Sequence, residues 1–245
     1  MCPGGTVVAA TSEPGRVVTN GMSQYSRNER NANAGMVVGI DPPDFPLDAA
    51  AWRAAFGEAQ GAQLAQEALE LSRQQPPVAH PLAGIVLQRQ LESRAYEVGG
   101  GTYEAPGQLV ADFLAQRPSS VWGSVQPSYK PGVKLGQLAD VLPEYAVTAM
   151  REALPVFGRK IKGYDMPDAV MTGVETRTSS PLKMPRGDDF QSINTCGLYP
   201  AGEGASYAGG ILSAGVDGIK VAEAMAKKYA SGHPLLNLNK SVLAE

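Results

Sequence analysis

Cysteine and histidine are scarce in this chain, which has two of each among its 245 residues. Cys2 and Cys196 are too few for a disulfide framework or a structural zinc site. His80 and His233 each precede a proline and have no spacing typical of metal ligands. We therefore expect a protein without a metal of its own, located in the cytoplasm or in a plastid stroma.

Long apolar runs and an excess of positive charge are also missing. No window approaches the roughly 20 consecutive apolar residues that a membrane-spanning helix needs. The start of the chain, Met-Cys-Pro-Gly-Gly, lacks the basic and apolar regions of a secretory signal. The formal net charge is -3, so no general attraction to nucleic acid or anionic lipid is expected. We predict neither a nucleic-acid partner nor a membrane partner.

The composition that is present favours a folded, turn-rich protein. Hydrophobic residues make up 43% and charged residues 18% of the chain, a balance that disordered segments do not have. The 28 glycines and 19 prolines predict frequent turns between short elements. The expected fold class is α/β in the broad sense, with helices and strands mixed along the chain.

Three stretches differ in texture and predict a three-part organisation. Residues 1–43 are strand-rich, residues 44–165 form a mostly helical inserted or capping segment, and residues 166–245 return to strand, turn and helix. Strands are predicted at residues 6–10, 17–19, 36–40 (fully buried), 168–174 and 197–201. Helices are predicted at residues 47–75 (one long or two short), 85–96, 106–116, 135–139, 143–154 and 210–230.

The segment that carries most chemical information reads Gly-Leu-Tyr-Pro-Ala-Gly-Glu-Gly-Ala-Ser-Tyr-Ala-Gly-Gly-Ile, at residues 197–211. Its small residues Gly202 and Gly204 let a ligand approach the backbone closely. Glu203 between them is placed to accept hydrogen bonds from ligand hydroxyls. Gly209 and Gly210 then open a helix, whose free N–H groups favour negative charge.

This segment has two other interpretations. An ordinary strand-to-helix turn without a ligand has the same spacing, because glycine-rich turns are common. A dinucleotide phosphate loop is rejected, because Tyr207 stands where the third glycine of that motif is required for helix packing.

Beyond this segment, several further stretches together resemble one protein family. They are Met-Cys-Pro-Gly-Gly at residues 1–5, Val-Thr-Asn-Gly-Met-Ser at 18–23, Asn-Ala-Asn-Ala at 31–34, Gln-Arg-Gln-Leu-Glu at 88–92, Gly-Gly-Gly-Thr-Tyr-Glu-Ala-Pro at 99–106 and Gly-Val-Glu-Thr-Arg-Thr-Ser-Ser-Pro at 173–181. With residues 197–224, these ordered matches resemble the C-terminal part of a family of FAD-dependent dehydrogenases. The resemblance implies part of an FAD-binding fold of the two-dinucleotide-binding-domain type.

This resemblance implies roles for particular residues. Gly202 and Glu203, with Gly204, would bind the ribityl chain of FAD. The backbone of Gly209, Gly210 and Ile211 would face the pyrimidine edge of the flavin, where a helix N-terminus stabilises negative charge.

Arg177 lies in a polar run directly after a predicted strand. Its guanidinium is suited to FAD or an anionic substrate, or alternatively to a structural ion pair with Glu175 or Asp188. The sequence leaves both interpretations open.

The resemblance also implies what is missing. A GxGxxG strand–turn–helix, which anchors the pyrophosphate, is not found in the sequence. We expect the C-terminal portion of an FAD-dependent oxidoreductase, acting on an unknown small molecule with an upstream polypeptide that carries the GxGxxG half. The isolated chain is expected to bind FAD weakly or not at all and to be inactive. The alternative is a non-catalytic interaction module that keeps this fold.

Overall fold

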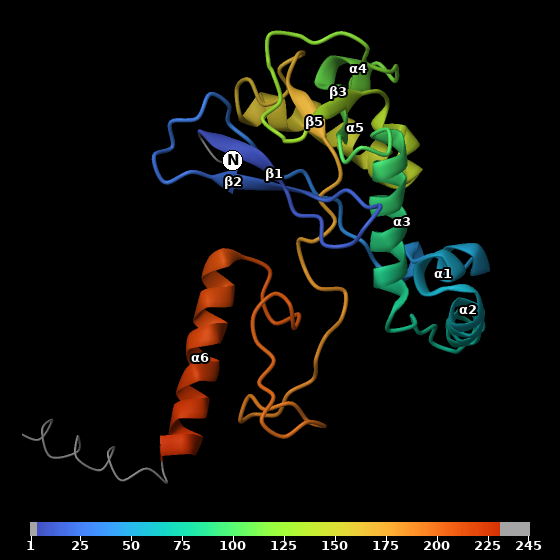
Figure 1. Ribbon diagram of the computed structural model, residues 1–245, viewed down its shortest axis with the longest axis vertical. Helices are drawn as coiled ribbons and strands as arrows, with labels where there is room; N and C mark the ends of the chain where they lie inside the picture. Colours follow the sequence, from blue (N-terminus) through green and yellow to red (C-terminus); the bar gives the residue numbers. More distant parts are fainter. Residues whose placement is uncertain (1–3, 231–245) are drawn as a thin grey trace, which may run out of the picture. The chain divides into compact units, whose positions relative to one another are not determined.

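The computed structural model describes residues 4–230, so Cys2 and His233 lie outside the described residues. The chain divides into two compact units, Met1–Arg177 and Thr178–Glu245. Within the described residues there are six α-helices, two short 3-10 helices and five strands in two small sheets (Figure 1). The mixed α/β class expected from composition is confirmed.

The first sheet is an antiparallel pair formed by β1 (Gly5–Ala9) and β2 (Thr19–Ser23), in which Gly5 faces Ser23. Asn33 fastens it, because its side-chain amide donates to the carbonyl oxygens of Thr6 at 2.9 Å and Met22 at 3.3 Å. A Cβ atom on Gly5 would lie 2.6 Å from Nδ2 of Asn33, so only glycine fits there. The contacts of Asn33 therefore give a structural reason for the motif segments at residues 1–5, 18–23 and 31–34, which they join.

The second sheet has the order β4-β3-β5, with β3 (Ala105–Leu109) parallel to β4 (Val133–Leu135) and antiparallel to β5 (Val170–Thr172). Gln108 is fully buried in the central strand. Its amide donates to the Arg117 carbonyl at 2.7 Å, and its carbonyl accepts from the Leu138 amide at 2.9 Å. These two hydrogen bonds satisfy the buried amide, and they tie the central strand to Arg117 before β4 and to Leu138 after it.

The helix predicted over residues 106–116 is wrong for its first half. Only α4 (Val110–Leu114) is helical there, and its buried Val110 and Phe113 are the residues that produced the helical pattern. The prediction at residues 135–139 is likewise replaced by β4 and the 3-10 helix η2 (Leu138–Asp140). Strand pairing between distant segments overrides local periodicity in both places.

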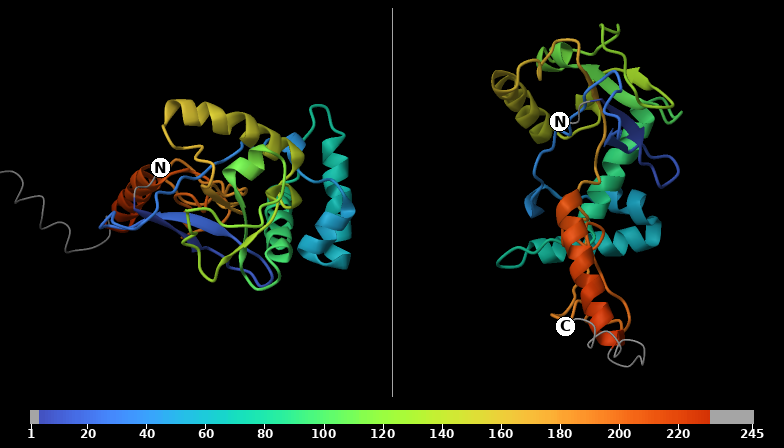
Figure 2. Two further views of the ribbon diagram at one scale, coloured as in Figure 1. Left: turned by 90° about the horizontal axis from the view of Figure 1, so that it is seen from above. Right: turned by 90° about the vertical axis from the view of Figure 1, so that its left-hand side faces the viewer.

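Three helices make a separate apolar cluster in the first unit. The paired helices α1 (Ala49–Phe56) and α2 (Glu58–Ser72) pack beside α3 (Ala83–Val98), and this arrangement is visible from different sides (Figure 1, Figure 2). Trp52 is fully buried at their centre, and its indole donates to the Pro46 carbonyl at 2.9 Å. The ring of His80 meets the Trp52 ring edge-on at 5.0 Å, so this loop histidine packs against the buried cluster. The helical prediction over residues 47–75 is confirmed, and of the two alternatives left open the structure has two helices rather than one long helix.

The remaining helix of the first unit is α5 (Glu144–Lys160), which packs Val147 and Leu154 against Phe113 and Leu138. The segment at residues 36–40 is not a strand, because no neighbouring segment pairs with it within the described residues. Val37 is 63% exposed, so its predicted full burial is also wrong. The η1 turn (Pro42–Asp44) follows it.

The second unit consists of an irregular segment and one long helix, α6 (Ile211–Ala230), as the helical period predicted. The strand predicted at residues 197–201 is absent from this described part of the chain. The Leu198 carbonyl accepts only one short-range hydrogen bond, from the Ser192 amide at 2.8 Å. A β-strand requires a partner, and residues 178–230 supply none for residues 197–201. Within residues 4–230, no helix combines the length and apolar character needed to cross a membrane.

Candidate functional site

The predicted flavin segment forms a chain of tight turns that leads into α6. The Tyr207 amide donates to the Gly202 carbonyl and the Ser206 amide to the Glu203 carbonyl, both at 3.0 Å. Gly202 has a φ of +66°, which favours glycine at this position. The structure therefore gathers Gly202, Glu203, Gly204, Gly209, Gly210 and Ile211 in one continuous turn–helix segment of the second unit.

The carboxylate of Asp217, on the first half of α6, holds this turn in place. It accepts a hydrogen bond from the Gly202 amide at 2.9 Å. It also forms a two-point ion pair with Arg186, at 2.6 and 2.9 Å. These bonds hold the pKa of Asp217 well below its ordinary value, at about 2, first because of Arg186 and then because of the Gly202 amide. Asp217 is thus a fixed anion that positions the backbone beside Glu203.

Arg186 is the centre of the irregular segment. Its guanidinium lies 3.6 Å from the centroid of the Tyr207 ring and 4.6 Å from that of Phe190, and it donates to the Pro200 carbonyl at 2.8 Å. The Tyr207 hydroxyl in turn accepts from the Arg186 amide at 3.1 Å. Tyr207 therefore packs within its own unit. The contacts of the Arg186 guanidinium with the two aromatic rings hold the irregular segment together.

Glu203 differs from Asp217 because its carboxylate has no hydrogen-bond partner or ion pair within residues 4–230. It is half-buried, on a turn that Asp217 fixes. Ile211 at the start of α6 is 90% exposed, and the N–H groups of a first helical turn have no intrahelical acceptors. The segment therefore presents an acceptor carboxylate and a set of donors, as a ligand with hydroxyl and carbonyl groups requires.

Arg177 belongs to the first unit and to a different set of contacts. Its Nε and Nη2 atoms donate to the two oxygens of Glu92, each at 2.9 Å, and its Nη1 donates to the Ser12 hydroxyl at 2.6 Å. Glu92 also accepts from the Thr176 hydroxyl at 2.7 Å. The hydrogen bonds that Arg177 donates to Glu92 raise the pKa of Arg177. The ion pair that the sequence left open is therefore with Glu92 rather than Glu175 or Asp188.

Two further arginines, Arg16 and Arg89, lie beside Arg177. All three form ion pairs with Glu13: Arg16 directly, Arg89 at 3.4 Å and Arg177 at 3.8 Å. We call these three residues the arginine cluster. Burial lowers the pKa of Arg16, and the charges of Arg89 and Arg177 lower it further. The arginine cluster is therefore a local concentration of positive charge in a chain of net negative charge.

A shallow hollow of about 210 Å³ lies elsewhere in the first unit. It is lined by Gly5, Thr6, Glu29, Arg30, Asn31 and Ser128. Arg30 and Asn31 both donate to the Gln126 carbonyl at 2.8 Å, so their side chains are occupied in holding this surface together. The hollow includes neither the arginine cluster nor the turn around Glu203.

The sequence did not predict the Arg186–Asp217 pair, and of the arginine cluster it predicted only Arg177. Arg186 and Asp217 are 31 residues apart, and no motif links them. Arg89 and Glu92 do stand together in the segment at residues 88–92, and Arg177 stands in the segment at 173–181. Charged residues recurring in separate motif segments were the available signal.

Two comparisons with known proteins bear on these sites. The sequence profile of a family described as "FAD-dependent protein, C-terminal domain-like" matches residues 1–76 and 59–178. A protein of Clostridium beijerinckii (strain ATCC 51743 / NCIMB 8052), described as an uncharacterized protein, is 46% identical over 229 residues. That alignment covers 94% of this chain and 37% of the relative, so the chain spans little more than a third of the relative's length. The profile covers the arginine cluster, and the alignment with the relative extends into the second unit.

Proposed function

Since the chain belongs to the family of FAD-dependent proteins that share this C-terminal domain, we propose that it is the C-terminal portion of an FAD-dependent oxidoreductase. It supplies the ribityl and isoalloxazine side of the flavin site and part of the substrate pocket. In fold terms, it is part of a two-dinucleotide-binding-domain-like flavoprotein. The observation that carries the assignment to particular residues is the Glu203 carboxylate, which has no partner within residues 4–230 and stands on a turn that Asp217 of α6 holds in place.

The residues of this segment suit a flavin. The Glu203 carboxylate accepts hydrogen bonds from ribityl hydroxyls, and Gly202 and Gly204 leave the backbone open to close approach. The amides of Gly209, Gly210 and Ile211 donate toward the pyrimidine edge, where the helix N-terminus stabilises negative charge. Bound FAD supplies the hydride chemistry. The protein's part is to hold the cofactor and tune its charge.

The relative's length supports a second element of this proposal. About two thirds of the relative lies outside the region that this chain matches. We place the pyrophosphate anchor, a GxGxxG strand–turn–helix, in a polypeptide that completes the site. Without it, the contacts to the pyrophosphate of FAD are missing, and the chain alone binds FAD weakly.

A chimaera tests the residue assignment. The matched region of the Clostridium relative is replaced by this chain, and the FAD content of the purified protein is measured by visible absorbance. We expect Glu203→Ala to lower FAD affinity about tenfold or more, because the ribityl hydroxyls lose an ionised acceptor that contributes about 1.5–3 kcal/mol. Glu223→Ala is the matched control, since Glu223 is an exposed glutamate on α6. Equal FAD affinity in the two variants would remove Glu203 from the site.

A further inference from the structure

We propose that the arginine cluster, Arg16, Arg89 and Arg177, is a binding site for a small ligand with a carboxylate group, and that Glu13 occupies this site until the ligand displaces it. As a substrate site it rests on the proposed function, whereas carboxylate binding itself does not depend on flavin.

The first support is the difference between the two glutamates that the cluster contacts. Glu92 is fully buried and accepts three hydrogen bonds of 2.7–2.9 Å, two from Arg177 and one from Thr176. Its removal would leave charge buried without a partner, so Glu92 is a permanent part of the structure. Glu13 is 34% exposed; it contacts Arg16 directly, and its contacts with Arg89 and Arg177 are 3.4 and 3.8 Å long, so its side chain reaches solvent whereas that of Glu92 does not. Glu13 is therefore the exchangeable anion.

The second support is the position of Glu13 on a loop. Residues 10–18 connect β1 and β2, and the base of this loop is closed by a hydrogen bond from the Ala10 amide to the Val18 carbonyl at 2.8 Å. The Val18 amide also donates to the Thr11 hydroxyl at 3.1 Å. Glu13 lies in the part of the loop beyond this closure. The loop itself is fixed, because the Val17 amide donates to the Glu92 carbonyl at 3.0 Å and Arg177 donates to the Ser12 hydroxyl at 2.6 Å. Exchange therefore needs only the exposed Glu13 side chain to turn toward solvent, while Arg16 on the same loop stays in place.

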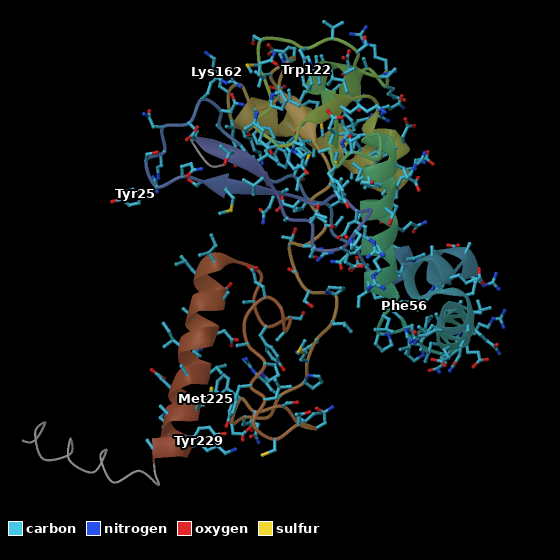
Figure 3. The ribbon with its side chains drawn as sticks, viewed as in Figure 1. Tyr25, Phe56, Trp122, Lys162, Met225 and Tyr229 are labelled. Atoms are coloured by element: carbon cyan, nitrogen blue, oxygen red, sulfur yellow. The ribbon has the colours of Figure 1, made fainter. Side chains whose placement is uncertain are left out.

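The third support is that Arg89 and Arg177 are held in place without Glu13, while Arg16, on the same loop as Glu13, donates to the Ser93 hydroxyl at 3.4 Å. Arg89 donates to the Ala55 carbonyl at 2.6 Å, and its guanidinium lies 5.1 Å from the centroid of the Phe56 ring (Figure 3 labels Phe56). Glu92 orients Arg177 through two parallel hydrogen bonds. The buried Nε of Arg89 donates no hydrogen bond within the described part of the chain. Fixed guanidinium groups with spare donors suit the two oxygens of a carboxylate.

The charge balance favours a ligand that is itself negative. With Glu13 in place, three arginines face two carboxylates, and the cluster has a net charge of +1. With Glu13 withdrawn, only Glu92 remains and the net charge is +2. Arg177 is 36% exposed, so the cluster is accessible from solvent on one side. An incoming carboxylate restores the charge balance that Glu13 provided.

The experiment measures succinate binding to the full chain by calorimetry at constant ionic strength, without FAD. Glu13→Gln is expected to bind succinate at least tenfold more tightly than the wild type, because the internal competitor has lost its charge. Arg89→Met keeps an apolar stem against Phe56 and is expected to weaken binding at least tenfold. Glu97→Gln is the matched control, because Glu97 is an exposed glutamate on the same helix as Arg89, paired with Arg94 at 3.1 Å.

The outcomes separate this proposal from the flavin assignment. Failure of Glu13→Gln to bind succinate, or equal succinate affinity in Glu13→Gln and Glu97→Gln, would overturn the proposal. Inorganic phosphate is the comparison ligand, and binding of phosphate without succinate would overturn the carboxylate assignment. Because Glu13→Gln tests a gain of affinity, a folding defect in Arg89→Met leaves the proposal falsifiable. FAD retention in the chimaera is measured independently of all these results.

Discussion

The change of Asp217 to asparagine tests whether the turn around Glu203 is held by the Arg186–Asp217 pair. The carboxylate accepts three hydrogen bonds, two from Arg186 and one from the Gly202 amide. Asparagine has one acceptor oxygen, and its NH₂ group would face an N–H donor. The lowering of the Asp217 pKa from 3.8 to about 2 corresponds to about 2 kcal/mol. We expect Asp217→Asn to destabilise the second unit by about that amount.

Native-state hydrogen exchange is the assay, because it reports the two units separately. A loss of about 2 kcal/mol speeds exchange of the α6 amides by about 30-fold, while the amides of α3 in the first unit keep their wild-type rates. The substitution Asp189→Asn is a suitable control, since Asp189 accepts only a local hydrogen bond from the Gln191 amide. Unchanged α6 exchange in Asp217→Asn would refute the idea that this pair fixes the turn.

The same pair predicts an acid dependence with a definite sign. The folded-state pKa of Asp217 lies below the value in the unfolded chain, so its contribution to stability is fully present above about pH 4. That contribution decreases as the pH falls toward 2. Protection of the α6 amides in the wild type is expected to fall over this range, and the Asp217→Asn variant should lose this part of the dependence. The same acid dependence in both proteins would contradict the assignment.

The remaining predictions concern the first unit. Gly5→Ala is expected to lower the free energy of unfolding by about 2 kcal/mol or more, because the added Cβ would lie 2.6 Å from Nδ2 of Asn33. Denaturant titration measures this loss. Gly39→Ala is the near-neutral control, because a Cβ there meets no atom within 4 Å. Gln108→Ala is expected to lower the free energy of unfolding by about 3 kcal/mol in the same titration. It leaves the Leu138 amide and the Arg117 carbonyl without their hydrogen-bond partner. A loss below about 1 kcal/mol in either variant would contradict the packing described.

The long helices were predictable because their signal is local, whereas the short helices predicted at residues 106–116 and 135–139 were wrong in whole or in part. Apolar residues at helical spacing over residues 85–96 and 210–230 locate α3 and α6 to within a few residues, whatever these helices pack against. Strands depend on a partner that the local sequence does not reveal. The apolar run at residues 36–40 has strand propensity and no partner, whereas residues 105–109, with a proline and a glycine, form the central strand of a sheet. Pairing outweighed propensity in both cases.

The candidate sites divide in the same way. The turn around Glu203 is continuous in sequence, so a motif was enough to locate it. The arginine cluster is assembled by folding, since Arg177 and Ser12 are hydrogen-bonded across 165 positions. The sequence identified Arg177 as an anion-binding candidate, but it did not reveal the surrounding arginines or Glu13.

The central claim is that this chain forms one side of a flavin site and that a second polypeptide region completes it. The most direct measurement is the visible spectrum of two purified proteins, the chain alone and the chimaera with the Clostridium relative, each after saturation with FAD and gel filtration. We predict about one FAD per chimaera and almost none on the chain alone. A stoichiometric yellow complex of the chain alone, or a colourless folded chimaera, would contradict the claim.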